Sequence, residues 1–149
     1  MRCVLQRVSS AAVRVGGEEV SGIGRGLVVL VGVERGDGPA QVQAAVRKLA
    51  HLRVFEDEEG RMNLDPATAG ASFLVVSQFT LAGSLARGRR PSFDGAAPPG
   101  DAEPLVGALV EALRAAGHRV ETGVFGASME VELVNDGPVT FVLDVPNAL

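Results

Sequence analysis

The sequence predicts a single α+β domain over residues 1–149, with a curved, barrel-like sheet that is mixed or largely antiparallel and two main helices packed outside it. Three observations predict this class. Short runs rich in Val, Leu and Ile recur along the whole chain. Only two stretches place apolar residues at helical spacing. Strands and helices do not alternate regularly, so a doubly wound parallel sheet is not expected.

The expected strands are short and mostly β-branched. Residues 3–8 and 11–15 are expected to form two strands with a pair of serines between them, and Gly16 then begins a Gly-Gly hairpin turn. Residues 27–31 are apolar throughout, which is typical of a strand buried on both faces. Further strands are expected at residues 19–23, 53–55, 62–64, 72–78, 118–122, 129–134 and 139–144.

Two helices are expected. The first begins near Gly38 and Pro39, and its apolar residues recur at helical spacing: Val42, Ala45, Val46, Leu49 and Leu52. Asp101 is expected to cap the second helix, with Pro104 in its first turn and Gly117 at its end. Residues 82–100, between these elements, have no periodicity. A loop this long in a compact domain is more often functional than filler.

Composition excludes several classes of site. Cys3 is the only cysteine and there are two histidines, so neither a disulfide framework nor a Cys or His metal site is expected, and no cofactor is implied. The N-terminus lacks the apolar run of a signal peptide. No stretch is long enough to span a bilayer, so no membrane partner is expected and a cytoplasmic location is the default.

The charge pattern argues against broad nucleic-acid binding. The net charge is −4, whereas such binding rests on phosphate neutralisation by Lys and Arg. A local contact remains open, because Arg87, Arg89 and Arg90 lie within four positions. These three residues form either a solvated loop or a small patch that faces phosphates.

The segment SQFTL at residues 77–81 follows a buried strand, where polar residues are well placed to line a site. Ser77 and Thr80 are candidate nucleophiles, but each would need a base, and no histidine lies near them in sequence. Ser77 also lacks a flanking Gly-x-Ser-x-Gly elbow. Strand termination and turn bonding are the alternative role for these hydroxyls.

The segment NDGPVT at residues 135–140 interrupts the pattern of the last two strands. Pro138 has no N–H for a strand ladder, and Gly137 has no side chain to pack. Such a pair indicates a hairpin turn, a bulge or a place where a ligand meets bare backbone. Most Asn-Asp-Gly-Pro stretches are hairpins.

Taken together, the two segments resemble the paired signature motifs of the D-aminoacyl-tRNA deacylase family. Other residues of the family frame occur in order over nearly the whole chain: LQRV at 5–8, GLVVLVGV at 26–33, Lys48, RVF at 53–55, GRMNL at 60–64, RGRRPSF at 87–93, TG at 122–123, Phe125 and Met129. The chain departs from the family pattern at residues 96–104, which are rich in Ala, Pro and Gly. This departure concerns the edge of the expected site.

The resemblance implies an enzyme that hydrolyses the ester between a D-amino acid and the terminal ribose of tRNA, and glycyl esters mischarged on tRNA(Ala), while sparing L-aminoacyl esters. It implies a homodimer in which the Gly137–Pro138 motif, with a cis bond, enters the partner's site and rejects L side chains through its carbonyls. Catalysis would then involve these residues: Ser77, Gln78, Phe79, Thr80, Gly137 and Pro138.

The resemblance also implies how the substrate is activated and held. Amides near Phe79 and Thr80 would stabilise the oxyanion, and the vicinal ribose hydroxyl would assist water. Residues implied in binding the substrate or the tRNA are Arg7, Phe125, Met129, Arg87, Arg89 and Arg90, of which the three clustered arginines would meet acceptor-stem phosphates. Arg7 would brace the Gly-Pro loop across the dimer. Three alternatives stay open: Thr80 as the nucleophile, a generic serine esterase, or a tRNA-end binding module without turnover.

Overall fold

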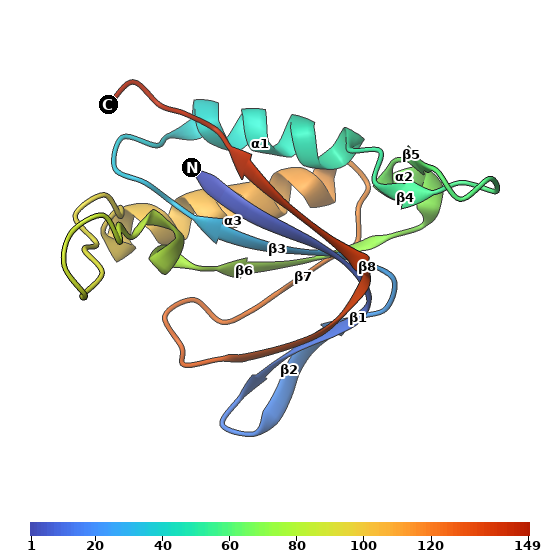
Figure 1. The fold of residues 1–149 in the computed structure, drawn as a ribbon, viewed down its shortest axis with the longest axis horizontal. Coiled ribbons are helices and arrows are strands. Elements are labelled where there is room, and N and C mark those ends of the chain that lie inside the picture. The colour runs from blue at the N-terminus through green and yellow to red at the C-terminus, as the bar shows by residue number, and fades with distance from the viewer.

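The computed structural model describes residues 1–149. The elements follow the order β1 (Arg2–Val15), β2 (Glu18–Ile23), β3 (Gly26–Gly32), α1 (Pro39–His51), β4 (Phe55–Glu56), β5 (Met62–Leu64), α2 (Pro66–Ala69), β6 (Ser72–Ser77), the 3₁₀ helix η1 (Phe79–Ala82), α3 (Pro99–Ala115), β7 (Val120–Thr122) and β8 (Glu130–Asp144). The two main helices, α1 and α3, lie together on one side of the sheet (Figure 1).

The sheet is mixed and strongly curled. Its order is β2-β1-β3-β6-β7, with β8 on the other side of β1. β1 pairs antiparallel with β2, β3 and β8, whereas β3, β6 and β7 are parallel. The two end strands of this order, β2 and β7, approach each other: the Ser21 hydroxyl of β2 donates to the Thr122 carbonyl of β7 at 2.6 Å. The predicted α+β class with a barrel-like sheet and two helices outside is confirmed.

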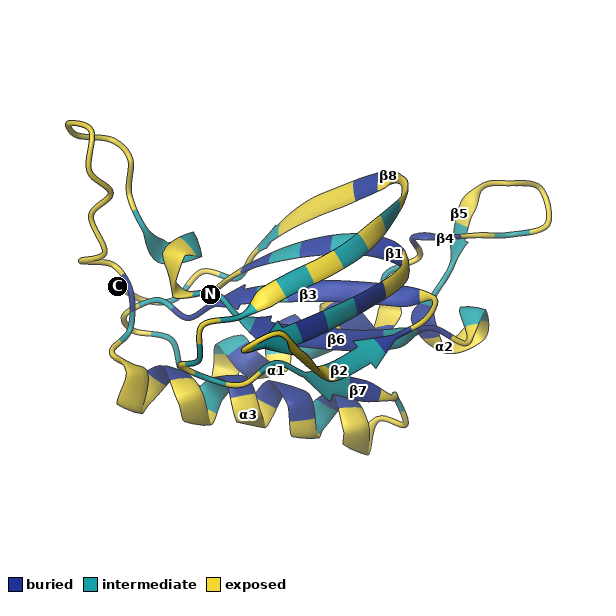
Figure 2. Cartoon of the chain, turned by 90° about the horizontal axis from the view of Figure 1, so that it is seen from below, coloured by how far each residue is buried: buried dark blue, intermediate teal, exposed yellow.

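Two apolar clusters hold these layers together. The larger cluster lies between the sheet and the helices, and its most buried side chains include Leu49, Phe55, Phe73, Leu109 and Leu113. The smaller cluster fills the inside of the curl. Figure 2 shows the buried residues along β3 and β6 and the largely exposed course of β8. Burying each large apolar side chain contributes about 1.5–3 kcal/mol.

Two expected strand breaks are wrong. The Ser9-Ser10 pair does not divide β1, which runs without interruption and accommodates Ser9 as an extra residue between the pairs Val8–Asn135 and Ser10–Val134. The Gly137–Pro138 pair does not divide β8 either. Both strands stay continuous because each meets a long partner, and a β-bulge absorbs the unpaired residues.

Smaller differences concern the helices. The second main helix, α3, begins at Pro99 with Pro98 as its N-cap, so Asp101 lies in the first turn and Pro104 inside the helix. The short helix α2, capped by the Asp65 carboxylate on the Thr68 amide, was not predicted. One turn of four residues is too short for the apolar periodicity that identified α1 and α3. A bilayer-spanning helix would need a longer apolar run than any helix here provides.

Candidate active site

The candidate site begins where β6 ends. β6 is buried up to Val76, and the Gln78 amide still donates to the Val31 carbonyl of β3 at 2.8 Å. The chain then turns into η1, where the Leu81 amide donates to the Gln78 carbonyl at 3.1 Å. Gly32 permits this turn, since a Cβ at that position would lie 2.7 Å from the Leu81 Cβ.

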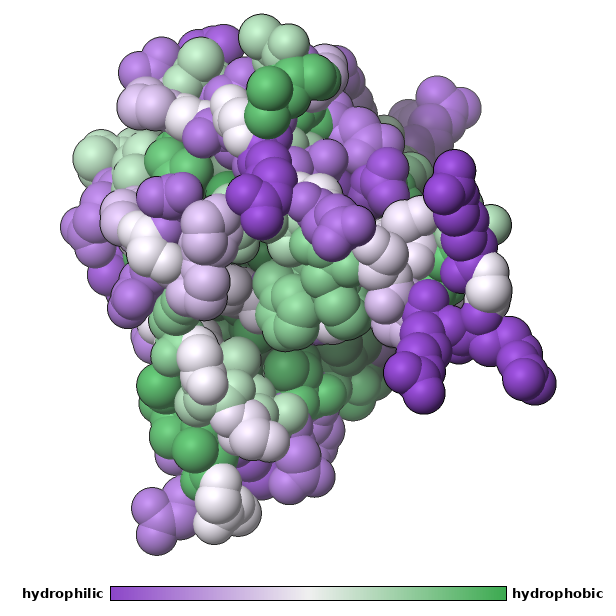
Figure 3. Space-filling view, turned by 90° about the vertical axis from the view of Figure 1, so that its left-hand side faces the viewer, coloured by the Kyte–Doolittle hydropathy of each residue, from purple (hydrophilic) through white to green (hydrophobic).

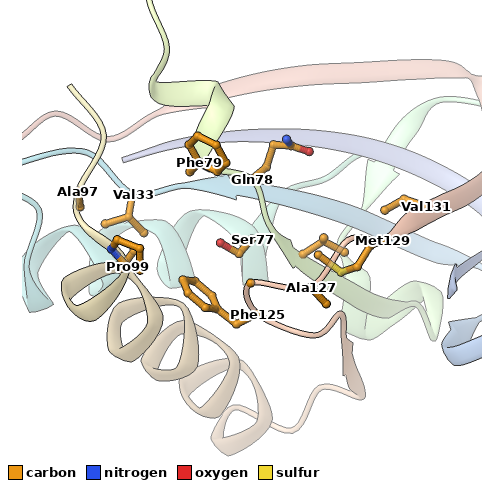
Figure 4. Close-up of a pocket in the computed structure, with 13 residues that line it drawn as sticks. Val33, Ser77, Gln78, Phe79, Ala97, Pro99, Phe125, Ala127, Met129 and Val131 are labelled. Atoms are coloured by element: carbon orange, nitrogen blue, oxygen red, sulfur yellow. The ribbon is translucent and has the colours of Figure 1, made fainter. Parts of the chain in front are cut away.

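An apolar pocket of about 520 Å³ opens beside this turn. It is lined by Val33, Val76, Ser77, Gln78, Phe79, Ala97, Pro99, Ala102, Phe125, Gly126, Ala127, Met129 and Val131. Figure 4 shows the Ser77 hydroxyl pointing into the space beside the Phe125 ring. Figure 3 faces this end of the molecule and shows apolar surface gathered in its lower half, below a more hydrophilic upper part. The pocket therefore unites five predicted residues from two separate segments, residues 77–79 and 125–129.

The backbone at this turn offers hydrogen-bond donors. The N–H groups of Phe79 and Thr80 are the first two of η1, and neither has an acceptor within the chain. The first amides of any helix lack a partner in the preceding turn. Two such amides beside an apolar pocket are suited to receive a carbonyl oxygen that gains negative charge.

The hydroxyl groups of the site have no base. The Thr80 Oγ1 accepts a hydrogen bond from the Gln78 Nε2, and no histidine or carboxylate bonds to Thr80 or Ser77. His118 packs edge-on against Phe73, at the opposite end of β6 from Ser77, and His51 ends α1. The structure thus contains no Ser-His-acid arrangement at the turn.

No ionisable side chain lines the pocket. The carboxyl groups whose pKa is lowered, Asp57 and Asp65, lie elsewhere and accept hydrogen bonds from the Arg61 and Thr68 amides respectively. No three His, Cys, Asp or Glu side chains gather where they could hold a metal ion. The chemistry that the pocket itself offers is apolar contact and backbone hydrogen bonding.

Gly137 and Pro138 lie outside this pocket. Residues 136–139 of β8 form a bulge opposite the single residue Arg7, between the pairs Gln6–Thr140 and Val8–Asn135. Of the alternatives that the sequence left open, the structure excludes the hairpin and shows the bulge. The Gly137–Pro138 bond is cis, and both residues are exposed. Within one chain, β1 and β3 stand between this bulge and β6.

Arg7 holds the bulge from within its own chain. Its side chain is only 4% exposed, and its Nε donates to the Asp136 carbonyl at 3.0 Å while its Nη1 donates to the Val54 carbonyl at 2.8 Å. Glu56 and Asp136 carboxylates lie 3.5 and 3.7 Å from the guanidinium. Within the chain, these bonds tie the bulge to β1 and to the segment before β4.

The three clustered arginines lie on the loop that follows η1. Arg87, Arg89 and Arg90 are exposed, and none forms an ion pair. They lie outside the lining of the pocket. The loop returns to the pocket at Ala97 and Pro99, which sequence reasoning did not name as site residues. The signal for them was the unusual Ala-Pro-Gly composition of residues 96–104.

Comparison with known proteins identifies the family. A family model described as D-Tyr-tRNA(Tyr) deacylase matches residues 4–144. A D-aminoacyl-tRNA deacylase of Thermomicrobium roseum is 58% identical over 144 residues, which cover 97% of this chain and 94% of the relative. One of Symbiobacterium thermophilum is 59% identical over the same length, covering 97% and 95%.

Solved structures agree on the fold. A c-Myc DNA Unwinding Element Binding Protein superposes with a TM-score of 0.92 at 42% identity, covering 98% of this chain and 99% of that one. A probable eukaryotic D-amino acid tRNA deacylase superposes with a TM-score of 0.81 at 21% identity, covering 97% and 98%, which supports the fold alone.

The fold and these matches place the protein among hydrolases that act on ester bonds. The chain belongs to the D-Tyr-tRNA(Tyr) deacylase family. The family resemblance drawn from the motifs at residues 77–81 and 135–140 is thereby confirmed.

Proposed function

We propose that the protein removes D-amino acids, and glycine mischarged on tRNA(Ala), from tRNA by hydrolysing the ester at the terminal ribose. One observation carries this proposal: the amides of Phe79, which lines an apolar pocket without acid–base side chains, and of the next residue, Thr80, have no partner within the chain. Such a site suits an ester whose own neighbouring hydroxyl group can assist the attacking water. Family membership and relatives named D-aminoacyl-tRNA deacylase support the substrate.

The proposed reaction uses backbone more than side chains. Water adds to the ester carbonyl, and the amides of Phe79 and Thr80 stabilise the resulting oxyanion. The bond between the carbonyl carbon and the ribose oxygen then breaks, and that oxygen takes up a proton. The vicinal ribose hydroxyl assists the attacking water. Removing one oxyanion donor typically lowers kcat by about 10²–10³.

The pocket itself is proposed to hold the terminal adenine. Phe125 provides a ring against which an unpaired base can stack, and Met129 provides a soft apolar contact. Both side chains point into the pocket (Figure 4). Because this contact reads the nucleotide and not the amino acid, the enzyme would accept many different D-amino acids.

The Gly137–Pro138 bulge is proposed to reject L-aminoacyl esters from the site of a second chain. Its exposed carbonyls would hold the α-ammonium and occupy the space that an L side chain requires. Gly137 has φ +141°, and a Cβ there would lie 2.5 Å from the Val139 Cγ2, so this backbone conformation depends on glycine.

A homodimer is proposed because one chain keeps the bulge and the pocket apart. Arg7, opposite the bulge, pairs with Leu27, whereas Ser77 pairs with Val31, so the two partners are four positions apart on β3, about 13 Å along the strand. β8 also leaves its outer edge unpaired along 15 residues and exposes Val134, Phe141 and Val142. Long apolar edge strands favour association with another chain.

The arginine-bearing loop is proposed to contact phosphates near the CCA end. Arg87, Arg89 and Arg90 have no carboxylate partner to release before they bind phosphate. With a net charge of −4, the rest of the surface does not favour nucleic acid. Recognition would therefore stay confined to the end of the tRNA, and we expect the enzyme to work in the cytoplasm, where charged tRNA is used.

The decisive assay compares the two enantiomers. Purified protein is incubated with D-aminoacyl-tRNA, with the matching L-aminoacyl-tRNA and with glycyl-tRNA(Ala), and ester loss is followed over time. Rapid loss from the D and glycyl esters alone supports the proposal. Slow loss from all of them would instead indicate a binding module without turnover. Turnover of simple esters that lack the ribose hydroxyl would indicate a generic serine esterase.

A complementation assay tests the cross-chain arrangement. Gly137→Ala is expected to impair the bulge, and Phe79→Pro removes one proposed oxyanion donor at a helix position that tolerates proline. Each variant alone should cleave D-aminoacyl-tRNA far more slowly than the unmodified protein. Mixed dimers regain one intact site if the bulge serves the partner, so mixing should restore D-specific cleavage. No recovery after verified subunit exchange would mean that the bulge serves its own chain or no site.

A further inference from the structure

The loop that carries the three arginines is closed at its base. The Ser84 amide donates to the Ser92 carbonyl at 2.7 Å, and the Ser92 amide donates back to the Ser84 carbonyl at 2.9 Å. Near the tip, Gly88 has φ +63°. We call residues 84–92 the arginine arm. Paired at its base, this arm can transmit a displacement to the residues on either side of it.

The residue directly after the arm packs back onto η1. The Phe93 ring meets the Phe79 ring edge-on, with centroids 5.2 Å apart and an angle of 62° between the planes. Gly83, which joins η1 to the arm, leaves room for this contact: a Cβ there would lie 3.0 Å from the Phe93 Cε1. The Gly83 amide also donates to the Thr80 carbonyl at 3.0 Å.

The segment beyond Phe93 is fixed to the end of β3. Arg35 donates from its Nε to the Asp94 carbonyl at 2.7 Å and from its amide to the Gly95 carbonyl at 2.9 Å. The Ala97 amide then donates to the Val33 carbonyl at 3.0 Å. Phe93 is therefore held against Phe79 from an anchored segment.

η1 depends on such outside support. It has four residues, none of them buried, and a 3₁₀ turn has few and poorly aligned hydrogen bonds of its own. Phe79 is 55% exposed despite its contact with Phe93. The orientation of the Phe79 and Thr80 amides must therefore be set by what packs against η1.

We propose that Phe93 is a positioning residue for the ester hydrolysis: by packing on Phe79 it fixes η1, and it couples the arginine arm to the two amides that receive the oxyanion. This inference rests on the proposed function. Phe93 itself touches no reacting atom. Phosphate binding by the arm then stabilises the contact between Phe93 and Phe79, which orients the Phe79 and Thr80 amides. Binding of the tRNA end and ordering of the oxyanion site are therefore coupled.

The test separates positioning from binding. Phe93→Ala is compared with Phe93→Tyr, which keeps the ring, and with Leu85→Ala, which removes an 80% exposed apolar side chain from the same arm. Each is assayed on D-aminoacyl-tRNA and on a 3′-D-aminoacyl-adenosine that carries no phosphate. Phe93→Ala should lower kcat about tenfold or more on both substrates with KM within about threefold, and Phe93→Tyr should restore it. Leu85→Ala should leave kcat unchanged.

A second readout does not require activity. In ¹H–¹⁵N spectra, the Phe79 and Thr80 amide signals should shift or broaden in Phe93→Ala and stay in place in Leu85→Ala, with melting temperatures within a few degrees of the unmodified protein. Unchanged signals and kcat in Phe93→Ala would overturn the inference, as would a rise in KM for tRNA alone. An unmodified protein that cleaves no D-aminoacyl ester refutes the proposed function instead, and the spectra still report whether Phe93 positions η1.

Discussion

Thr80 and Ser77 are the residues at which the chemistry of the site can be decided. Their hydroxyl groups lie at the turn between β6 and η1, yet neither bonds to a histidine or carboxylate that could take a proton. A serine or threonine without such a partner is a weak nucleophile. The amides beside them need no activation. The backbone donors are therefore better suited to catalysis than either hydroxyl group.

Substituting these hydroxyls provides the first prediction. Thr80→Ala and Ser77→Ala should each keep deacylation of D-aminoacyl-tRNA within about tenfold, because no covalent step passes through either side chain. Loss of a true nucleophile costs on the order of 10⁶ in kcat. Single-turnover rates on the same substrate measure the difference. A near-complete loss in Thr80→Ala alone would establish Thr80 as the nucleophile and refute the backbone model.

Cys3 provides a second prediction at this scale. It is fully buried in β1, and burial raises the pKa of its thiol to about 12. Only the thiolate reacts with iodoacetamide, so the folded protein should resist alkylation at pH 8 and react once it is unfolded in guanidinium. Since the folded pKa exceeds the unfolded value of about 8.5, the associated stability is full below pH 8.5 and is lost toward pH 12. Rapid alkylation of the folded protein would contradict this burial.

At the scale of elements, the pairing of β1 with β8 decides what Gly137 and Pro138 can do. The long partner strand keeps β8 continuous, so the pair forms a bulge instead of a turn. Arg7 then fills the space opposite the bulge and satisfies carbonyl groups of Asp136 and Val54. One buried side chain thus links the bulge to the segment before β4.

Replacing Arg7 tests this link. Arg7→Ala leaves two carbonyl groups without their donors and should lower the free energy of unfolding by about 1–3 kcal/mol, as measured by urea denaturation. Because the bulge loses its support, discrimination between D- and L-aminoacyl-tRNA should also fall. Arg7→Lys keeps the charge, but a single ammonium group cannot donate to both carbonyls as the planar guanidinium does. This variant should therefore recover only part of the stability and part of the discrimination. Unchanged discrimination in both variants would separate Arg7 from chiral selection.

At the scale of the whole molecule, charge limits how much tRNA the protein can contact. The net charge is −4 and the arginine arm is the expected point of contact with phosphate. Arg47 on α1 is suited as a control, because it is exposed and forms neither an ion pair nor a side-chain hydrogen bond. Binding through so few cations should depend only weakly on salt.

A salt titration checks this expectation. The logarithm of the tRNA binding constant should fall against the logarithm of salt concentration with a slope of roughly −2 to −3, corresponding to about three phosphate contacts. Alanine at Arg87, Arg89 and Arg90 together should bring the slope close to zero, whereas Arg47→Ala should not change it. A slope near −6 or steeper would reveal an extensive phosphate-binding face and contradict recognition of the end alone.

Much of the fold was predictable from local pattern. The continuous apolar run of β3, the helical spacing from Val42 to Leu49 and the turn at Gly16 each reflect rules that act over a few residues. The continuity of β1 and β8 was not predictable, because it depends on a partner more than a hundred positions away. The four-residue helix α2 was likewise too short to leave a periodic signal.

The fold class, the family and the two motifs could be read from the sequence alone, because they rest on short runs of residue types and on the order of those runs along the chain. The three-dimensional structure was needed to show that the SQFTL motif lies with Phe125 and Met129 around one pocket, that Arg7 donates to the Asp136 carbonyl of the bulge, and that the Gly137–Pro138 bulge lies apart from that pocket. Those relations depend on strand order and register. Both are fixed by packing between distant segments, and local sequence does not encode that packing.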